Sequence, residues 1–191
     1  MHLREPRVAP LPESDWTDEH RRVLRPMTSG GPILNIFRTL ANDVEALKAF
    51  LAWGGYVLSR KNALPPRERE LAILRTGWLC KSGYEWTQHV EIARRWGVTD
   101  AEIAAVKAGP EASLWSPADA AILRATDELH EGQFISDAAW SALSAYFTVK
   151  QRMDLVFTVG QYTQVSMILN SFGVQLDEGQ VLDKDLDRRR P

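Results

Sequence analysis

The stretch that decides the fold runs from Leu64 to Gly97 and reads LPPRERELAILRTGWLCKSGYEWTQHVEIARRWG. A double proline opens it, and Pro66 can occupy the first turn of a helix, where its missing N–H costs nothing. Apolar residues then recur with the helical period of 3.6 until Lys81-Ser82-Gly83 interrupts them. Ser82 can cap a second helix that ends at Gly97. The stretch therefore predicts two helices, joined by a tight break, that can pack antiparallel.

The helical period continues on both sides of this stretch, and we find no alternating pattern typical of a strand. Proline-rich residues 1–13 read as an extended arm, and capping residues and glycines bound the helices that follow. Further helices are expected at about 15–24, 42–59, 99–109, 136–147 and 148–171, and another from Ser116 to about His130. The fold class is therefore all-α, a multi-helix bundle. We divide the chain into an N-terminal arm with a short helix (1–30), a helical domain (31–175) and a charged tail (176–191), which is an arm or disordered.

Composition excludes several classes of function. The 191 residues carry a formal net charge of −2, whereas a nucleic-acid-binding protein normally has a basic excess. No apolar run approaches the ~18 residues of a transmembrane helix. The first residues lack the apolar segment of a secretory signal, and the single cysteine, Cys80, fits a reducing compartment. We therefore expect a cytoplasmic protein that uses neither nucleic acid nor membrane as a partner.

Three side chains in the central stretch could carry chemistry. Glu85 and His89 are four residues apart, so they lie about 40° apart on one helix face, within mutual reach. Glu70 lies on the preceding helix, and antiparallel packing would bring it toward them. Histidine changes its protonation state near pH 7, and burial shifts the pKa of a glutamate. Such a cluster can move a proton between carbon and oxygen without a cofactor.

Simpler interpretations of the same residues stay open. A glutamate and a histidine at this spacing often form a solvated pair on a helix surface. Aromatic side chains surround the cluster in sequence and are typical of a core as well as of a substrate cage: Trp78, Tyr84, Trp86 and Trp96. A metal site made of Glu70, Glu85 and His89 is conceivable, but no His-Glu-x-x-His sequence supports it. We therefore predict neither a metal nor a cofactor.

The order of these residues resembles the carboxymuconolactone decarboxylase family and the related alkyl hydroperoxidase D-like proteins, closely over 64–109 and loosely over 30–175. In the hydroperoxidase relatives a glutamate precedes Cys-x-x-Cys, and a histidine follows four residues after the second cysteine. Glu70 and His89 match the glutamate and the histidine. Ser82 and Glu85 stand in place of the two cysteines, and Tyr84 in place of a second histidine. The dithiol cycle of those relatives therefore cannot run here.

The resemblance implies a bundle of the alkyl hydroperoxidase D-like type that assembles as a homo-oligomer, a trimer or a hexamer. It also implies a decarboxylase-like enzyme that works by proton transfer (decarboxylation or isomerisation) on a small organic acid or lactone. His89 would be the principal base or acid, Glu85 would tune it or share its proton, and Glu70 would complete the relay. Ser82 and Tyr84 would offer hydroxyls to the substrate, and Trp86 is a further candidate substrate contact.

Two other functions remain as alternatives. A peroxiredoxin-like peroxide reductase could use Cys80 alone with an external reductant. It would need a thiol whose pKa lies well below ~8.5, whereas a thiol at a helix end is also a common structural residue. A non-catalytic oligomer that binds a small molecule in the same pocket is the second alternative.

Overall fold

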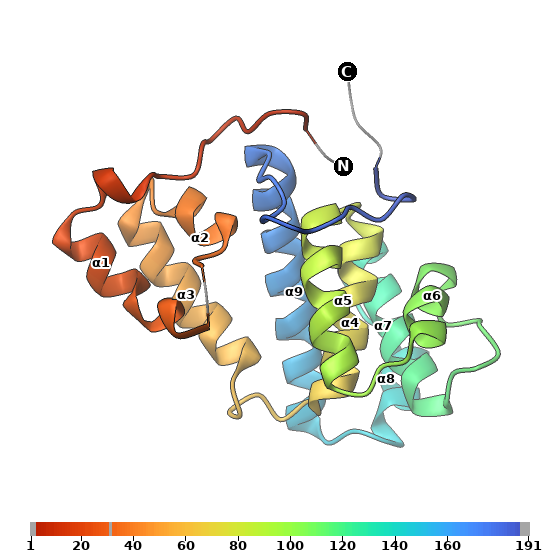
Figure 1. Cartoon of the computed structure of the whole chain (residues 1–191). Coiled ribbons are helices and arrows are strands. Elements are labelled where there is room, and N and C mark those ends of the chain that lie inside the picture. Colours follow the sequence, from red (N-terminus) through yellow and green to blue (C-terminus); the bar gives the residue numbers. More distant parts are fainter. Residues whose placement is uncertain (1–2, 31, 188–191) are drawn as a thin grey trace.

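The computed structural model describes residues 3–30 and 32–187, and within these residues it is all-α, as predicted, without a strand (Figure 1). Two short 3-10 segments, Glu13–Asp15 and Arg25–Gly30, accompany the α-helices. The helices are α1 (Asp18–Leu24), α2 (Asn35–Leu40), α3 (Val44–Leu58), α4 (Pro66–Leu79), α5 (Gly83–Arg95), α6 (Asp100–Ala108), α7 (Pro117–Gly132), α8 (Asp137–Ser144) and α9 (Val149–Phe172).

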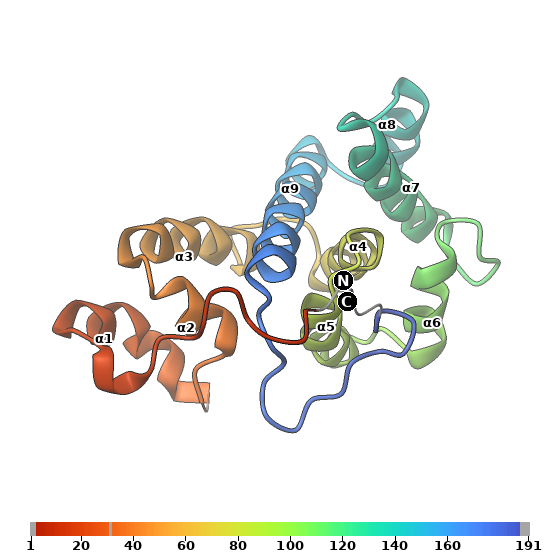
Figure 2. The ribbon, with the colours of Figure 1, turned by 90° about the horizontal axis from the view of Figure 1, so that it is seen from above.

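Helix α4 is the centre of the bundle. It packs against α5, α6, α7 and α9, which surround it when the molecule is seen from above (Figure 2). Every residue from Arg69 to Gly77 is buried, so this helix has no solvated face. A helix that is enclosed on all sides must find partners for its polar side chains inside the protein. Glu70 is one of these enclosed polar residues, and its partner is described below.

The predicted break between α4 and α5 is a helix end of the Schellman type. Lys81 adopts a left-handed conformation with φ of 55°, which reverses the chain. The backbone N–H of Ser82 donates to the carbonyl oxygen of Gly77 at 2.8 Å, and that of Lys81 donates to Trp78 at 3.1 Å. Ser82 is the N-cap residue of α5, as expected, but its side chain makes no capping hydrogen bond. The backbone therefore closes this turn without help from the serine hydroxyl.

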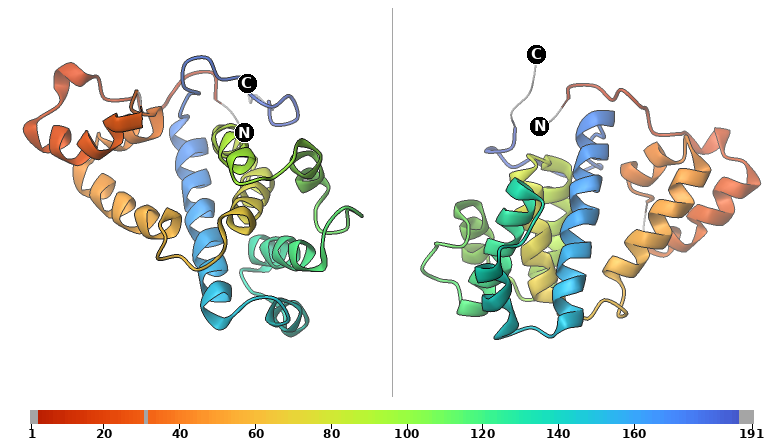
Figure 3. Two further views of the ribbon diagram at one scale, coloured as in Figure 1. Left: turned by 60° about the horizontal axis from the view of Figure 1, so that its bottom comes forward. Right: turned by 180° about the vertical axis from the view of Figure 1, so that it is seen from behind.

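The N-terminal helices form a layer of their own. α1, α2 and α3 lie on one side of α9, and α6, α7 and α8 lie on the other side of the bundle (Figure 3). α3 contacts α9, and it begins after Asp43, whose side chain accepts from the N–H of Ala46. The helix α2 was not expected from the sequence. Its N-cap residue, Leu34, makes no side-chain capping hydrogen bond, so no local capping signal marks its start.

The C-terminal segment 176–187 returns over the start of α5 as an arm (Figure 2). Leu186 is fully buried, and the Lys107 ammonium on α6 bonds Asp183 and Asp185, both at 2.8 Å. The approach to α5 is close, because a Cβ on Gly83 would lie 2.3 Å from the Cδ1 atom of Leu182. The outermost residues of the expected arm and tail, 1–2 and 188–191, lie outside the described residues. Among the described helices, none combines the length and apolarity needed to cross a membrane.

Candidate active site

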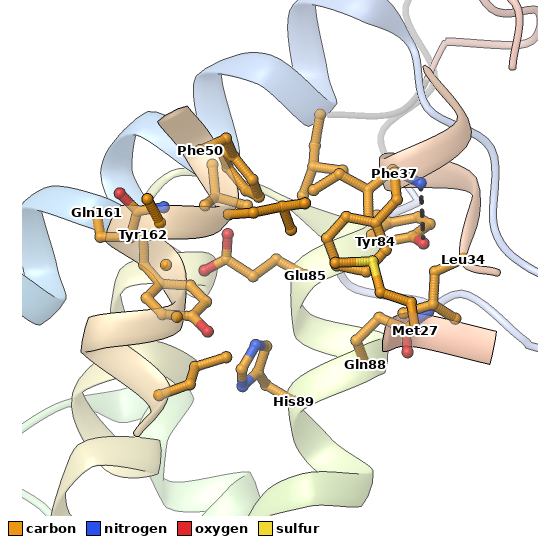
Figure 4. A pocket seen from close by; sticks show the side chains of 18 of the residues that line it. Met27, Leu34, Phe37, Phe50, Tyr84, Glu85, Gln88, His89, Gln161 and Tyr162 are labelled. Carbon is orange, nitrogen blue, oxygen red and sulfur yellow. Dashed lines mark hydrogen bonds between the residues drawn. The ribbon is translucent and has the colours of Figure 1, made fainter. Parts of the chain in front are cut away.

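A cavity of about 680 Å³ lies between the N-terminal layer and the helices α5 and α9. Its wall is mainly apolar, with side chains from α2, α3 and the preceding loop on one side and from α9 on the other (Figure 4). The apolar lining includes Met27, Leu34, Phe37, Phe50, Val165 and Leu169. A few polar side chains interrupt this surface: Tyr84, Glu85, Gln88, His89, Gln161 and Tyr162. A mainly apolar cavity with a few polar groups is typical of a small-molecule site.

The imidazole of His89 is held from behind by Glu70. Its Nδ1 atom lies 2.7 Å from the Oε2 atom of Glu70, and both residues are buried. The antiparallel packing of α4 and α5 therefore brings these two side chains together. The Tyr162 ring meets the imidazole edge to face at 4.8 Å between centroids. These contacts fix the ring in a position where it lines the cavity.

Glu85 is buried in the same wall, with 2% of its surface exposed. Its Oε2 atom accepts from the Ser166 hydroxyl on α9 at 2.9 Å, and its Oε1 atom has no partner. Gly77 on α4 makes room for it, because a Cβ there would lie 3.2 Å from Oε1. Burial raises the pKa of Glu85 well above its ordinary value of 4.5, and the charge of Glu70 adds to the rise, while the Ser166 bond opposes it. Burial therefore favours the neutral carboxylic acid form of Glu85.

The sequence predicted that Glu85 would act directly on His89, but in the structure the two side chains have different hydrogen-bond partners. Among the described residues, the hydrogen bonds of the two side chains go elsewhere: His89 pairs with Glu70, and Glu85 pairs with Ser166. The 40° offset on α5 turns each side chain toward a different neighbouring helix. Both still line the cavity, so they can meet one ligand from two directions.

Asp177 of the C-terminal arm ties two walls of the cavity together. Its Oδ2 atom accepts from the Tyr84 hydroxyl at 2.6 Å and from Gln88 at 2.7 Å, both on α5. Its Oδ1 atom accepts from the backbone N–H of Asn35, the first residue of α2, at 2.7 Å. Burial, followed by the bond to Asp177, raises the pKa of the Tyr84 hydroxyl. Tyr84 therefore stays protonated and serves as a donor.

We expect Asp177→Ala to lower the free energy of unfolding by about 2–3 kcal/mol, because three hydrogen bonds worth about 1 kcal/mol each are lost. In a chain of this size the melting temperature should fall by about 5–10 °C. Calorimetry of the variant measures the change. Glu178→Ala is the matched control, since this acidic neighbour is exposed. Equal melting temperatures for wild type and Asp177→Ala would contradict the expectation.

The other predicted contacts lie away from the cavity. Ser82 is fully buried, its hydroxyl has no partner, and it is not part of the cavity lining. Trp86 is turned about 100° from Glu85 around α5. Its ring centroid lies 5.5 Å from that of Trp78, and it belongs to a hydrophobic core cluster. It also lines a smaller hollow beneath the C-terminal arm. Trp96, which we expected to shelter the cluster, is 51% exposed.

Cys80 is half-buried at the end of α4 and does not line the cavity. Its sulfur lies 3.7 Å from the Nδ1 atom of His130. Burial raises the thiol pKa, and the nearby Glu85 raises it further, while bonds to Ser166 and Thr163 oppose the rise. A raised pKa leaves little thiolate at neutral pH, and the thiolate is the form that attacks peroxides.

We expect the Cys80 thiol to react with a disulfide reagent such as DTNB at least about tenfold more slowly at pH 7.4 than free cysteine, because its pKa is raised. Unfolding in urea should remove the difference. Peroxide consumption by Cys80→Ala should equal that of wild type. A fast-reacting thiol together with peroxide consumption that depends on Cys80 would contradict this.

Sequence reasoning missed the contribution of α9. Gln161, Tyr162 and Ser166 lie on this helix, and all three are buried. Gln161 and Ser166 stand next to apolar residues of this 24-residue helix, and this pattern is a signal that could have been used. The helical period alone does not say which of them faces a cavity. Among the described residues, no group of three or more His, Cys, Asp or Glu side chains is arranged to hold a metal ion.

Comparison with known proteins places this site in a family. The model of the carboxymuconolactone decarboxylase family matches residues 45–128. These residues belong to that family. The carboxymuconolactone decarboxylase segment runs from α3 into α7 and contains Glu70, Glu85 and His89. No curated protein matches the sequence significantly.

Solved structures share the fold of this chain. An uncharacterized peroxidase-related protein from Ralstonia eutropha JMP134, described as an alkylhydroperoxidase AhpD core, is 21% identical with a TM-score of 0.79, over 90% of this chain and 92% of the other. The debrominase Bmp8 in complex with 2,3,4-tribromopyrrole is 17% identical with a TM-score of 0.73, over 90% and 91%. A peroxidase-related protein from Silicibacter sp. TM1040 is 15% identical with a TM-score of 0.71, over 98% and 94%. At these identities the likeness concerns the fold.

Proposed function

We propose that this protein is a cofactor-independent enzyme that moves a proton on a small neutral carbonyl compound, such as an unsaturated lactone. The observation that carries the proposal is one cavity wall that holds both the buried carboxyl of Glu85 and the imidazole of His89, which is backed by Glu70. A base and an acid that meet the same ligand are what enolisation and double-bond isomerisation require.

His89 is the proposed base. With a carboxylate at Glu70, the Nδ1–H of His89 donates to Oε2 across 2.7 Å, which leaves the lone pair on Nε2. Nε2 then takes a proton from the carbon next to the substrate carbonyl. Glu70 stabilises the imidazolium that results, because its negative charge faces the new positive charge at short range.

Glu85 is the proposed acid. Its raised pKa favours the neutral carboxyl, which can donate a hydrogen bond or a proton to the oxygen that becomes negative as the enolate forms. The imidazolium of His89 returns its proton at a second carbon, and Glu85 takes back any proton that it gave to the oxygen, which completes an isomerisation with no net change in protons. The mainly apolar wall keeps water away and strengthens both interactions.

The charge of the lining favours a neutral substrate over an organic acid. Among the described residues that line the cavity, Lys48 is the only lysine or arginine. Its ammonium is already paired with Glu19 at 2.5 Å and with Glu45 at 2.6 Å. A substrate carboxylate would therefore be desolvated in the cavity without a counter-charge, which is costly. This narrows the class expected from the sequence to lactones and related neutral carbonyl compounds.

The test is a substrate panel followed by absorbance and proton NMR. It contains a β,γ-unsaturated lactone (α-angelica lactone), a β,γ-unsaturated cyclic ketone and a β-keto acid. We expect isomerisation of the first two above the buffer rate, and deuterium incorporation in D₂O, with no decarboxylation of the third. Binding of the lactone and the ketone without turnover or deuterium exchange would instead indicate a non-catalytic binding protein.

The homo-oligomer remains a proposal, which light scattering during size-exclusion chromatography checks.

A further inference from the structure

The side-chain amide of Gln161 is a buried group without a partner. The residue is 3% exposed, and among the residues that the structure describes neither its Nε2 nor its Oε1 atom finds a hydrogen-bond partner. Buried amides are normally paired, because an amide that loses water without finding a partner destabilises the folded state. Gln161 also lines the large cavity. This unpaired amide therefore lies where a ligand could supply the missing hydrogen-bond partners.

The surroundings of this amide explain why no protein group satisfies it. Across the cavity wall stands Gly54 of α3, where a Cβ would come within 3.5 Å of the Nε2 atom of Gln161. Because glycine has no side chain, this position leaves space beside the amide and offers it no side-chain acceptor. Figure 4 shows the amide at the same end of the cavity as Tyr162 and the carboxyl of Glu85. The Oε1 atom of Glu85 is also without a partner.

The amide of Gln161 and the carboxyl of Glu85 can meet the same ligand group. Ser166, which holds Glu85, lies five residues after Gln161 on α9. Both groups lie at the same end of the cavity (Figure 4). One ligand carbonyl oxygen can therefore accept from Gln161 at one lone pair and from Glu85 at the other, while a neighbouring ring carbon faces His89.

We propose that Gln161 is the specificity-determining residue of this cavity and that the compound it selects is a lactam. The amide turns toward the bound ring. Its Nε2–H donates to the ligand carbonyl, and its Oε1 accepts from the ligand N–H beside that carbonyl. These two parallel hydrogen bonds satisfy both atoms of Gln161. A lactone or a ketone offers only the acceptor and leaves Oε1 unpaired.

The inference deepens the proposed function and rests on it only in using the same cavity. If both hold, the substrate is an unsaturated lactam whose ring carbon loses a proton to His89. An un-ionised carboxylic acid has the same pair of donor and acceptor, but at neutral pH it ionises. The cavity offers a carboxylate no unpaired lysine or arginine among its described lining residues.

The test measures binding of three inert probes of nearly equal shape by calorimetry. They are 3,4-dihydroquinolin-2-one (a lactam), its N-methyl derivative and dihydrocoumarin (the lactone). For wild type we expect the lactam to bind about tenfold more tightly than the other two, the upper end for one additional neutral hydrogen bond. Gln161→Leu should bind all three within about twofold of one another. Gln164→Leu is the matched control, because Gln164 lies on the same helix and is exposed; it should keep the preference.

Several results would overturn the inference. These are the absence of a lactam preference in wild type, a preference that survives in Gln161→Leu, and no binding of any probe at its solubility limit. Gln161→Met, which is unbranched and similar in length, replaces the leucine variant if that variant does not fold. The probes do not isomerise, so the outcome is independent of turnover. If wild type prefers the lactam probe but isomerises no substrate, only the proposed function is contradicted. If it isomerises a substrate but shows no preference for the lactam, only this inference is contradicted.

Discussion

His89→Gln should lower the turnover of the best substrate by about 10²- to 10⁴-fold, the range supplied by a positioned general base. Glutamine can still donate to the Glu70 carboxylate that lies 2.7 Å from the Nδ1 atom of His89, so the buried carboxylate keeps a partner. It cannot take up a proton. The loss should therefore appear in turnover, with a melting temperature close to that of wild type. Initial rates and thermal melts of the two proteins provide the measurement.

Two further variants separate chemistry from packing at this position. His89→Ala leaves a space that free imidazole can enter, and added imidazole should restore part of the turnover. Glu70→Gln keeps the imidazole but removes the charge that stabilises its protonated form, so turnover should fall by about 10²-fold or more. Turnover by His89→Gln equal to that of wild type would remove His89 as the base, whatever the other variants do.

Glu85→Gln should change activity and stability in opposite directions. Turnover should fall by about 10²- to 10³-fold, because the neutral acid that faces the developing oxyanion is lost. The free energy of unfolding of the variant, compared with that of wild type, should rise as the pH increases through neutrality. Burial raises the pKa of Glu85 in the folded protein well above the 4.5 of the unfolded chain, so unfolding releases a proton between these two values.

The sign of the pH effect follows from that proton. The wild-type free energy of unfolding falls as pH rises from 4.5 toward the raised pKa, by at most about 1.4 kcal/mol per pH unit. Glutamine does not ionise, so this contribution to the slope is absent in Glu85→Gln. Urea unfolding at a series of pH values from 4.5 to 9 measures the difference in slope. Glu91→Gln, an exposed site on the same helix, is the control and should keep the wild-type slope. Identical slopes for Glu85→Gln and wild type would show that Glu85 is ionised in the folded protein.

Much of the fold could be predicted from local signals. The α6 and α9 helices begin at the capping boxes of Thr99 and Thr148, and α7 and α8 begin at the side-chain caps of Ser116 and Ser136. Each such cap satisfies backbone N–H groups within three residues, so the sequence carries the whole signal. The pairing of Glu70 with His89 could also be anticipated, because one tight break between two helices leaves few ways to pack them.

Other features depend on segments far apart in the sequence. The first N–H of α2 is satisfied by Asp177, 142 residues away, so no nearby residue indicates where that helix begins. The role of Ser166 was missed for the same reason, because Ser166 lies 81 residues from the Glu85 that it holds. The position predicted for Trp86 differs from its place in the structure for a related reason. Spacing gives the angle between side chains on one helix but not which neighbour covers each angle.

The sequence by itself determined a helical protein, its central antiparallel pair of helices and the contact of a glutamate with a histidine between them. Local capping and helical periodicity are sufficient for these features, because their energies come from residues close together in the chain. Only the tertiary structure decided that burial raises the pKa of Glu85, that Gln161 is left unpaired among the described residues, and that Asp177 joins two walls of the cavity. Burial and hydrogen-bond partners are set by helices that meet across the fold, and no local pattern specifies that meeting.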